Sequence, residues 1–515
     1  MNMLRVWGGG VYESDLFYSM ADRRGILVWQ DFMFADALYP ATPAFLDSVA
    51  DEARQQIRRL GHHASLVLWC GNSENELGMA YNWWKLLTQE HRVDYVKLYV
   101  ETLQRTVYDE DMSRPFLGSS PSNGILSELN EGVNDNPNNV LYGDVHYYDY
   151  YSPPWSLGSV PTPRFCSGFG LVSFPSFETL STAFASEDLV FPFSQLIENR
   201  LHLANSRLEI YLSSVLNLPR KDGSEQSFKV FIFLTQVYQA MGVKTQAEHF
   251  RRHRLTLRRS RGLTMGALFW HLNDVWQAPS WSSIDYLGNW KMLHYFAVRF
   301  FAPLLVSAHV DGDRLLVYAI DDLYAGEPYN LRLDVRLYHY GSFVPRLSLT
   351  HVFPMSSLVQ VVSAKNLSEL LSSASCSRNN SFLTFRLSND SDGETLSSNF
   401  LLLQVPRLAT EIPSAALKIS NVSALHSEDE SLRGSNVHEI ELKTDAVALF
   451  VWLSAGRVRG RFSDNGFIMV DKTTSLTFTS DLPLDVAQLR LNISVTCLNC
   501  LRHAGYSPMA DIKTQ

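Results

Sequence analysis

Residues 26–74, ILVWQDFMFADALYPATPAFLDSVADEARQQIRRLGHHASLVLWCGNSE, decide the fold. Two short apolar runs at 26–32 and 65–69 flank a segment, 43–59, whose apolar residues recur at helical spacing. Such a strand, helix and strand in succession predict a βαβ unit, in which the two strands run parallel.

The same alternation continues through residues 1–300. Strand patterns fall at 3–7, 26–32, 65–69, 115–118, 140–147, 164–168 and 265–271. Helical patterns separate most of them, at 14–24, 43–59, 95–108 and 228–254. We therefore expect an α/β domain over 1–300, a (β/α)8 TIM barrel with its active site at the carboxyl ends of the strands.

The count of strands is one short of a closed barrel. Seven patterns precede residue 300, and the sequence opens inside the first of them, at MNMLRVW (1–7). The simplest interpretation is a chain truncated at its N-terminus, with the first barrel strand missing. Because a barrel without one strand exposes two sheet edges, a fragment that does not fold alone is one hypothesis.

Beyond residue 301 the apolar residues change to a period of two. YNLRLDVRLY (329–338) and QLRLNISV (488–495) each place alternate apolar residues on one face, and Asn465-Gly466 is a hairpin-turn signal. We expect two immunoglobulin-like β-sandwich domains, 301–405 and 406–515, with a polar loop near 425–436. The predicted fold class is thus α/β plus all-β.

Composition and charge exclude several classes of protein. The chain is 46% hydrophobic and 19% charged, so it can build large cores. A net charge of −9 argues against a nucleic-acid partner, and no apolar run is long enough for membrane insertion. Its 11 Trp, 22 Tyr and 29 Phe suit a cleft in which aromatic rings pack against sugars.

Two further features bear on the compartment. Cys497 and Cys500 form a CxxC without a second pair, which favours a local disulfide or free thiols over a zinc site. Asn-X-Ser/Thr sequons occur only after residue 360, which favours a secretory-pathway protein glycosylated away from its active domain. The candidate glycosylation sites are Asn366, Asn379, Asn389, Asn421 and Asn492.

The strongest candidate site follows the strand pattern at 65–69. In LVLWCGNSENE (66–76), Gly71 lets the backbone turn, and Asn72, Ser73 and Glu74 then project at the rim. A single Glu after a strand is ordinarily a loop carboxylate. Next to Trp, Cys, Gly and Asn in an aromatic-rich barrel, it is a stronger candidate for a functional site.

Six motifs in order carry a family resemblance. LRVWGGGVYE, ILVWQDFMFA, LVLWCGNSE, DVHYYDY, RFCSGFG and WHLNDVWQAPSW resemble consecutive barrel strands of glycoside hydrolase family 2. Within that family they are similar to the β-mannosidase branch of the animal lysosomal kind. The resemblance runs through nearly the whole chain, including both C-terminal sandwiches.

The resemblance implies a retaining mechanism with two carboxyl groups. In the family, the acid/base Glu ends strand 4 and the nucleophile Glu ends strand 7. With one strand restored, Glu74 ends the fourth strand and Gly168 the seventh, so Glu74 matches the acid/base. Retaining enzymes hold the two groups about 5–5.5 Å apart, and the nucleophile raises the pKa of the acid.

The nucleophile position departs from the family. Gly168 stands where the family has Glu, so no covalent intermediate can form there, and loss of that charge should lower the pKa of Glu74. Ser73 stands where the family has an Asn that binds the sugar 2-hydroxyl. Four other carboxylates are candidates to replace the nucleophile, and none is favoured: Asp31, Asp144, Asp149 and Glu178.

Other rim residues are assigned to substrate binding. His146 and Tyr147 end the sixth strand, where the family places a tyrosine against the nucleophile, although core aromatics would fit equally well. Trp270 is either a platform under the sugar or barrel packing. The predicted substrate-binding set is Trp7, Asp31, Asn72, Ser73, His146, Tyr147 and Trp270.

The sequence therefore predicts a β-mannosidase-type hydrolase that removes terminal non-reducing β-D-mannose from oligosaccharides of glycoprotein catabolism. The expected protein is a lysosomal monomer without metal or cofactor, which reaches the secretory pathway by a signal peptide absent from this chain. The alternatives are a catalytically inactive carbohydrate-binding paralogue and a non-functional fragment, both because Gly168 replaces the nucleophile.

Overall fold

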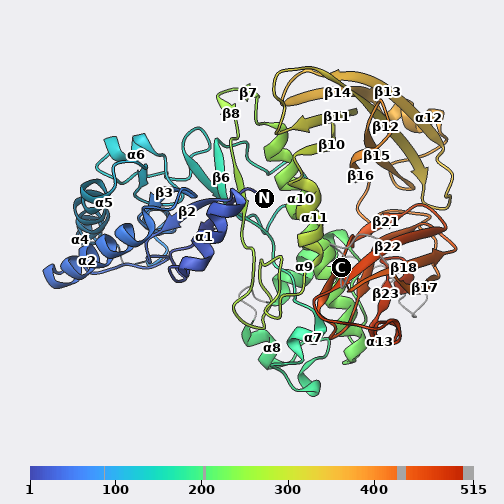
Figure 1. The fold of residues 1–515 in the computed structure, drawn as a ribbon, viewed down its shortest axis with the longest axis horizontal. Coiled ribbons are helices and arrows are strands. Elements are labelled where there is room, and N and C mark those ends of the chain that lie inside the picture. Colours follow the sequence, from blue (N-terminus) through green and yellow to red (C-terminus); the bar gives the residue numbers. More distant parts are fainter. Residues whose placement is uncertain (86, 201–204, 426–435, 503–515) are drawn as a thin grey trace, which may run out of the picture. The chain divides into compact units, whose positions relative to one another are not determined.

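The computed structural model describes residues 1–85, 87–200, 205–425 and 436–502, which form two compact units (Figure 1). The first unit comprises Met1–Tyr148, Gly158–Phe169 and His249–Trp270. The second comprises Asp149–Leu157, Gly170–Glu248 and His271–Gln515. All seven predicted barrel strands lie in the first unit, so that unit positions the candidate site.

The barrel strands form two parallel sheets. One has the order β1-β2-β3-β4, and the other has the order β5-β6-β9. A bridge between Ser122 and Asp144 links the end of the first sheet to β5. The strands are β1 (Met3–Val6), β2 (Leu27–Asp31), β3 (Leu66–Cys70), β4 (Phe116–Leu117), β5 (Asp144–Tyr147), β6 (Phe165–Phe169) and β9 (Ala267–Phe269). The predicted fold class, TIM-barrel strands followed by β-sandwiches, is confirmed.

Helices return the chain between these strands. In α2, Pro43 opens the helix, and buried residues at Val49, Ala53, Ile57 and Leu60 repeat every three or four positions. That spacing places one apolar stripe against the sheet, which is why the segment is helical. The helices of this unit are α1 (Asp15–Arg24), α2 (Pro43–Leu60), α3 (Asn75–Ala80), α4 (Gln89–Tyr95), η1 (Val96–Gln104), α5 (Arg105–Glu110) and α6 (Ile125–Leu129).

The two outermost barrel strands, β1 and β9, lie in contact. Within the described residues, however, no strand ladder joins them, so each keeps one unpaired edge. A short antiparallel pair, β7 (Leu257–Arg258) and β8 (Arg261–Gly262), precedes β9.

The second unit begins with helices. Its longest, α10, carries a nearly continuous set of buried residues because neighbouring elements cover it on several sides. The helical elements are α7 (Phe177–Leu180), η2 (Ser186–Asp188), α8 (Gln195–Arg200), α9 (Asn205–Val215), α10 (Glu225–Arg252) and α11 (Met292–Phe300). The last four residues of α10 belong to the first unit.

Two groups of antiparallel strands follow, coloured orange and red in Figure 1. In β12, the predicted face of Leu331, Leu333, Val335 and Leu337 is buried in the first core. The first group comprises β10 (Leu304–Asp311), β11 (Arg314–Asp321), β12 (Tyr329–His339), β13 (Leu347–Met355), β14 (Val359–Asn366), α12 (Leu367–Ser373), β15 (Ser381–Asn389) and β16 (Thr395–Leu402).

The second group has its own core, which includes Tyr295 of α11. It comprises β17 (Leu417–Ala424), β18 (Asn436–Thr444), β19 (Ala448–Ser454), β20 (Gly460–Phe462), β21 (Phe467–Met469), β22 (Thr473–Ser480), α13 (Val486–Asn492), β23 (Ser494–Thr496) and η4 (Cys500–Arg502). A disulfide joins Cys497 to Cys500, which decides between the two alternatives left open for that pair. The limits 300 and 405 between domains stay a prediction.

Two local predictions were wrong. Residues 488–495 are not one strand, because Asp485 and Gln488 form a capping box that starts helix α13, and only Ser494–Thr496 pairs as β23. Asn465-Gly466 is not a hairpin turn, since β20 and β21 belong to different sheets. The Asn465 amide instead bonds the backbone of Leu453. The loop expected near 425–436 falls largely on 426–435, outside the described residues.

Candidate functional site

Glu74 lies just past the end of β3, in a sharp backbone turn. Gly71 permits that turn, because a Cβ there would lie 2.5 Å from the carbonyl oxygen of Gly118. The turn leaves Glu74 at a φ of 63°, in the left-handed region that non-glycine residues seldom adopt. Its backbone N–H donates to the Ser120 carbonyl at 2.8 Å, so the segment after β4 fixes the residue.

The Glu74 carboxylate contacts the imidazole of His146 in β5. The His146 Nδ1 atom forms a hydrogen bond and ion pair with Glu74 Oε1. On the other side of the ring, Nε2 lies 3.2 Å from an Arg5 guanidinium nitrogen. An ionised carboxylate can only accept, so Nδ1 donates its proton to Glu74.

Position 168 lies against the same imidazole. A Cβ built on Gly168 would sit 3.0 Å from His146 Cδ2 and 3.1 Å from the hydroxyl oxygen of Tyr148. A side chain at 168 would therefore point at the ring that Glu74 contacts. The two positions singled out in the sequence thus share one histidine, with a tyrosine hydroxyl beside the glycine.

The pKa of Glu74 is lowered from its usual range. Burial raises this pKa, but the hydrogen bond and charge of His146 and the charge of Arg5 lower it further than burial raises it. The sequence also predicts a lowered pKa for Glu74. The structure shows which groups stabilise its ionised carboxylate. In its ionised form, Glu74 accepts hydrogen bonds and has no proton to donate.

A second carboxyl group, that of Asp36, adjoins Glu74. Burial and the negative charge of Glu74 raise the pKa of Asp36 to about 6. The Asp36 backbone N–H donates to Ser73 at 3.1 Å, which holds the loop after β2 against the Glu74 turn. Asp36 is not predicted from the sequence, where its only signal is its place five residues after a strand.

Asp31, expected in the cleft, is instead buried beneath it. Its carboxylate accepts hydrogen bonds from Arg5 at 2.7 Å, the Trp29 indole at 2.8 Å and the Gly8 backbone at 3.1 Å. Asp31 is 0% exposed. These bonds make Asp31 the anchor of Arg5, which in turn contacts His146. The sequence analysis did not single out Arg5.

Asn72 and Ser73 are also buried rather than presented at the rim. The Asn72 amide donates to Gly118 at 2.8 Å, and its oxygen accepts from the Asn75 backbone and the Ser119 hydroxyl. Ser73 forms backbone bridges to Ala35 and Ser120. Asn72 and Ser73 therefore hold the backbone turn that carries Glu74.

The predicted aromatic residues divide into two groups. Trp7 and Trp270 meet edge to face, with ring centroids 4.9 Å apart, at the ends of β1 and β9. Tyr147 points elsewhere, since its hydroxyl lies 2.9 Å from that of Ser159. The tyrosine facing position 168 is Tyr148, and the alternation of strand residues is the signal that separates the two.

Asp144 and Asp149 hold local structure. Asp144 accepts hydrogen bonds from the hydroxyls of Ser120 and Ser167, at 2.7 and 2.6 Å. Asp149 accepts from the backbone N–H groups of Tyr151 and Ser152. Glu178, also considered, lines a cavity of the second unit.

The sequons lie in the strand-rich part of the chain. Asn389, the last residue of β15, is half-buried, and the other four candidates are exposed: Asn366, Asn379, Asn421 and Asn492. Among the described residues, no three His, Cys, Asp or Glu side chains gather as a metal site requires. No helix of the described chain is long and apolar enough to cross a membrane.

Comparisons with known proteins show which proteins the chain resembles. A family model of a mannosidase Ig-fold domain matches residues 417–500. The β-mannosidase of Capra hircus is 42% identical over 507 residues, and that of Rattus norvegicus is 40% identical over 511. Both alignments cover 97% of this chain.

Nearly the whole chain is thus similar to β-mannosidases. A crystal structure of a β-D-mannosidase from Dictyoglomus thermophilum aligns with 96% of the chain, with a TM-score of 0.77 at 28% identity. The chain spans about half the length of these β-mannosidases, namely 56% of the Capra hircus protein and 56% of the Dictyoglomus thermophilum chain.

Proposed function

We propose that this chain carries the site of a retaining β-mannosidase in which glycine occupies the nucleophile position. The substrate is terminal non-reducing β-D-mannose on oligosaccharides released by glycoprotein breakdown. One observation carries the proposal: Glu74 and position 168 face the same His146 ring. The choice of sugar follows from the β-mannosidases to which the chain is similar.

Retaining hydrolysis needs an acid/base and a nucleophile on opposite sides of the anomeric carbon. Glu74 takes the first role, and His146 with Arg5 holds its carboxylate. Gly168 cannot attack the sugar, so the first step lacks its nucleophile. Glu74, with its lowered pKa, also lacks the proton that the leaving oxygen needs, and both effects reduce turnover.

The test is hydrolysis of 4-nitrophenyl β-D-mannoside by the chain as it stands and by Gly168→Glu. We expect the Glu variant to raise kcat/KM by about 10⁴-fold or more, as is typical when a covalent nucleophile is present rather than absent. Gly168→Gln is the matched control, because it adds the same bulk without a nucleophilic charge. Equal rates for all three proteins would refute the assignment of position 168.

A second candidate is a catalytically inactive carbohydrate-binding protein. It rests on Gly168 alone, since aromatic contacts to a sugar survive the loss of a nucleophile. Binding of mannose by the unaltered chain, together with failure of Gly168→Glu to hydrolyse the aryl mannoside, would favour this candidate.

The remaining proposals concern context. The sequons on exposed residues and the Cys497–Cys500 disulfide support a glycosylated protein of the secretory pathway, and the family supports the lysosome as its destination. We propose a monomer without cofactor or metal, whose substrate is an oligosaccharide. Mass spectrometry before and after glycosidase treatment of the secreted chain tests the glycosylation directly.

A further inference from the structure

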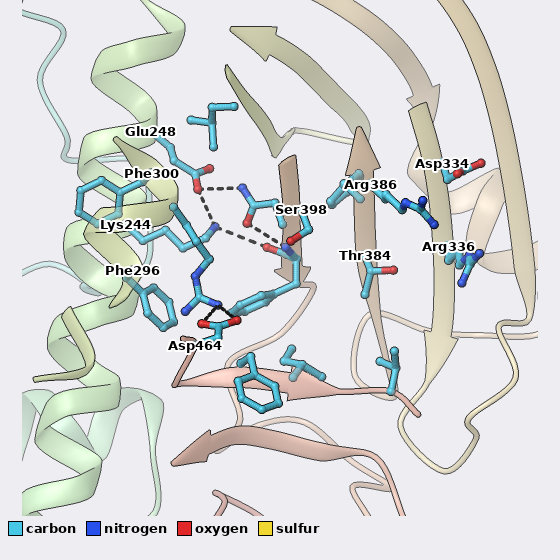
Figure 2. Close-up of a pocket in the computed structure, with 18 of the residues that line it drawn as sticks. Lys244, Glu248, Phe296, Phe300, Asp334, Arg336, Thr384, Arg386, Ser398 and Asp464 are labelled. Carbon is cyan, nitrogen blue, oxygen red and sulfur yellow. Dashed lines mark hydrogen bonds and ion pairs between the residues drawn. The ribbon is translucent and has the colours of Figure 1, made fainter. Parts of the chain in front are cut away.

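Two cavities of similar size lie in the second unit. The first, about 320 Å³, is lined by α10, α11 and strands of both sandwiches (Figure 2). Two of its cations are paired: Lys244 lies 3.1 Å from Glu248, and Arg299 lies 3.2 Å from Asp464. Asn399 donates a further bond to Glu248 at 2.9 Å, and Arg386 donates to the Gly393 carbonyl at 2.9 Å. These polar groups already bond to one another or to the backbone, which leaves them less available to a ligand.

The second cavity, about 290 Å³, is lined by several polar groups that form no bond with the described residues. It is lined by α7, α10, α11 and the residues before α11 on one side, and by the second sandwich on the other. A volume near 300 Å³ is at the lower end of the range for small-molecule sites. We call it the Trp452 cavity.

An aromatic wall runs along the Trp452 cavity. The Trp290 and Tyr295 rings meet edge to face at 5.2 Å, and the Tyr295 and Trp452 rings at 5.9 Å. The Tyr295 hydroxyl accepts a hydrogen bond from Phe462, which fixes the middle ring. Neither indole N–H of the two tryptophans donates to a described residue, although both line the cavity. These donors are available to a ligand.

Acceptors face the same space. The Glu178 carboxylate forms no hydrogen bond or ion pair with the described residues, although it lines the cavity and is half-buried. Asn289 donates through Nδ2 to Thr179 and Asp285, while its Oδ1 has no donor among the described residues. By contrast, Asp285 at the same wall accepts bonds from Ser176 and Thr179 hydroxyls.

This combination of groups selects the class of ligand. Hydroxyl groups both donate and accept, so a polyhydroxylated ligand satisfies indole donors and carboxylate acceptors together. The apolar faces of a pyranose match the aromatic wall. An anion would meet the Glu178 charge, and the Lys229 ammonium nearby is already paired with Glu225. A neutral sugar meets all of these conditions.

We propose that the Trp452 cavity binds a neutral pyranose unit of an oligosaccharide, independently of catalysis at Glu74. Trp290 and Trp452 supply apolar surface and N–H donors, and Glu178 and Asn289 accept hydrogen bonds from sugar hydroxyls. The ligand is held by the second sandwich and the helices next to it. This inference does not rest on the proposed hydrolytic function.

The test uses the whole chain labelled with 5-fluorotryptophan and titrated with β-1,4-mannobiose. Trp452→Phe identifies the Trp452 resonance, so binding at this cavity is read separately from binding near Glu74. We expect a saturable shift of that resonance, and a Kd raised about tenfold or more in Glu178→Gln, which removes a charged acceptor. Glu187→Gln, an exposed carboxylate in the same segment, should leave the Kd unchanged.

Three outcomes would overturn the proposal: no shift of the Trp452 resonance at saturating mannobiose, an unchanged Kd in Glu178→Gln, or an equal effect of Glu187→Gln. Glu178→Gln keeps the fold because its side chain makes no internal bond, so a change in Kd reports contact with the ligand. Failure of Gly168→Glu to hydrolyse a mannoside would leave this result intact, which separates it from the proposed function.

Discussion

A carboxylate restored at position 168 should raise the pKa of Glu74. In the chain as it stands, His146 and Arg5 hold this pKa below its usual range. Retaining glycosidases place their two carboxyl groups about 5–5.5 Å apart. At about 5.5 Å and an effective dielectric constant of about 20, two like charges repel by about 3 kcal/mol, or about 2 pKa units.

Sterics add to this effect in the same direction. A Cβ at 168 would lie 3.0 Å from His146 Cδ2 and 3.1 Å from its Cγ, so the imidazole must shift by a few tenths of an ångström. A displaced ring weakens its hydrogen bond to Glu74, which also raises the pKa of Glu74. Gly168→Gln imposes the same displacement without the charge, so the difference between the two variants isolates electrostatics.

The assay is a carboxyl-carbon NMR titration, with the Glu74 signal identified by its absence in Glu74→Gln. We expect the pKa of Glu74 to rise by about 2 units in Gly168→Glu relative to Gly168→Gln. The basic limb of the pH–rate profile of Gly168→Glu should follow the same value. If the two variants differ by less than about 0.5 unit, position 168 does not face Glu74 across a shared site.

Three further predictions concern stability. Asp31→Asn removes the partner of a buried guanidinium, Arg5, and should lower the free energy of unfolding by about 3–5 kcal/mol in urea; a loss below about 1 kcal/mol would contradict this anchoring role. Burial raises the pKa of Glu76 to about 7, so the folded state binds its proton more tightly, and stability should fall by about 3 kcal/mol as pH rises from about 4.5 to 7. Glu76→Gln should flatten that dependence, and an unchanged slope would show that another group titrates. Cys500→Ser opens a very short disulfide loop and should cost only about 2 kcal/mol, measured by thermal unfolding; no cost under oxidising conditions would argue against the disulfide.

The sequence predicted the strands well because each apolar run is short and bounded by polar residues. β1, β2, β3 and β6 begin and end within one or two residues of the predicted limits. Glu74 could also be found, since it follows a strand that ends in a glycine turn. His146 was found as the end of a strand, but its contact with Glu74 depends on packing between β3 and β5, which no local pattern encodes.

The direction of strand-end side chains was not predictable. The ladders shift register between Val28 and Trp29, and again between Val145 and His146. The extra residue of each shift lies in the other strand, Val67 in β3 and Ser167 in β6, so the side chains that follow it in those strands turn to the opposite face. In the same way, the apolar residues of 488–495 fit a strand by period, while the capping box at Asp485 makes the segment helical.

The claim that everything else depends on is an empty nucleophile position facing Glu74, and chemical rescue tests it most directly. The unaltered chain is incubated with 2,4-dinitrophenyl β-D-mannoside and azide, so that the leaving group needs no acid and azide displaces the phenolate. We predict α-D-mannosyl azide, identified by NMR, because the anion enters from the face that Gly168 leaves open. With sugar binding confirmed, formation of no mannosyl azide, or of the β-anomer, would contradict the account.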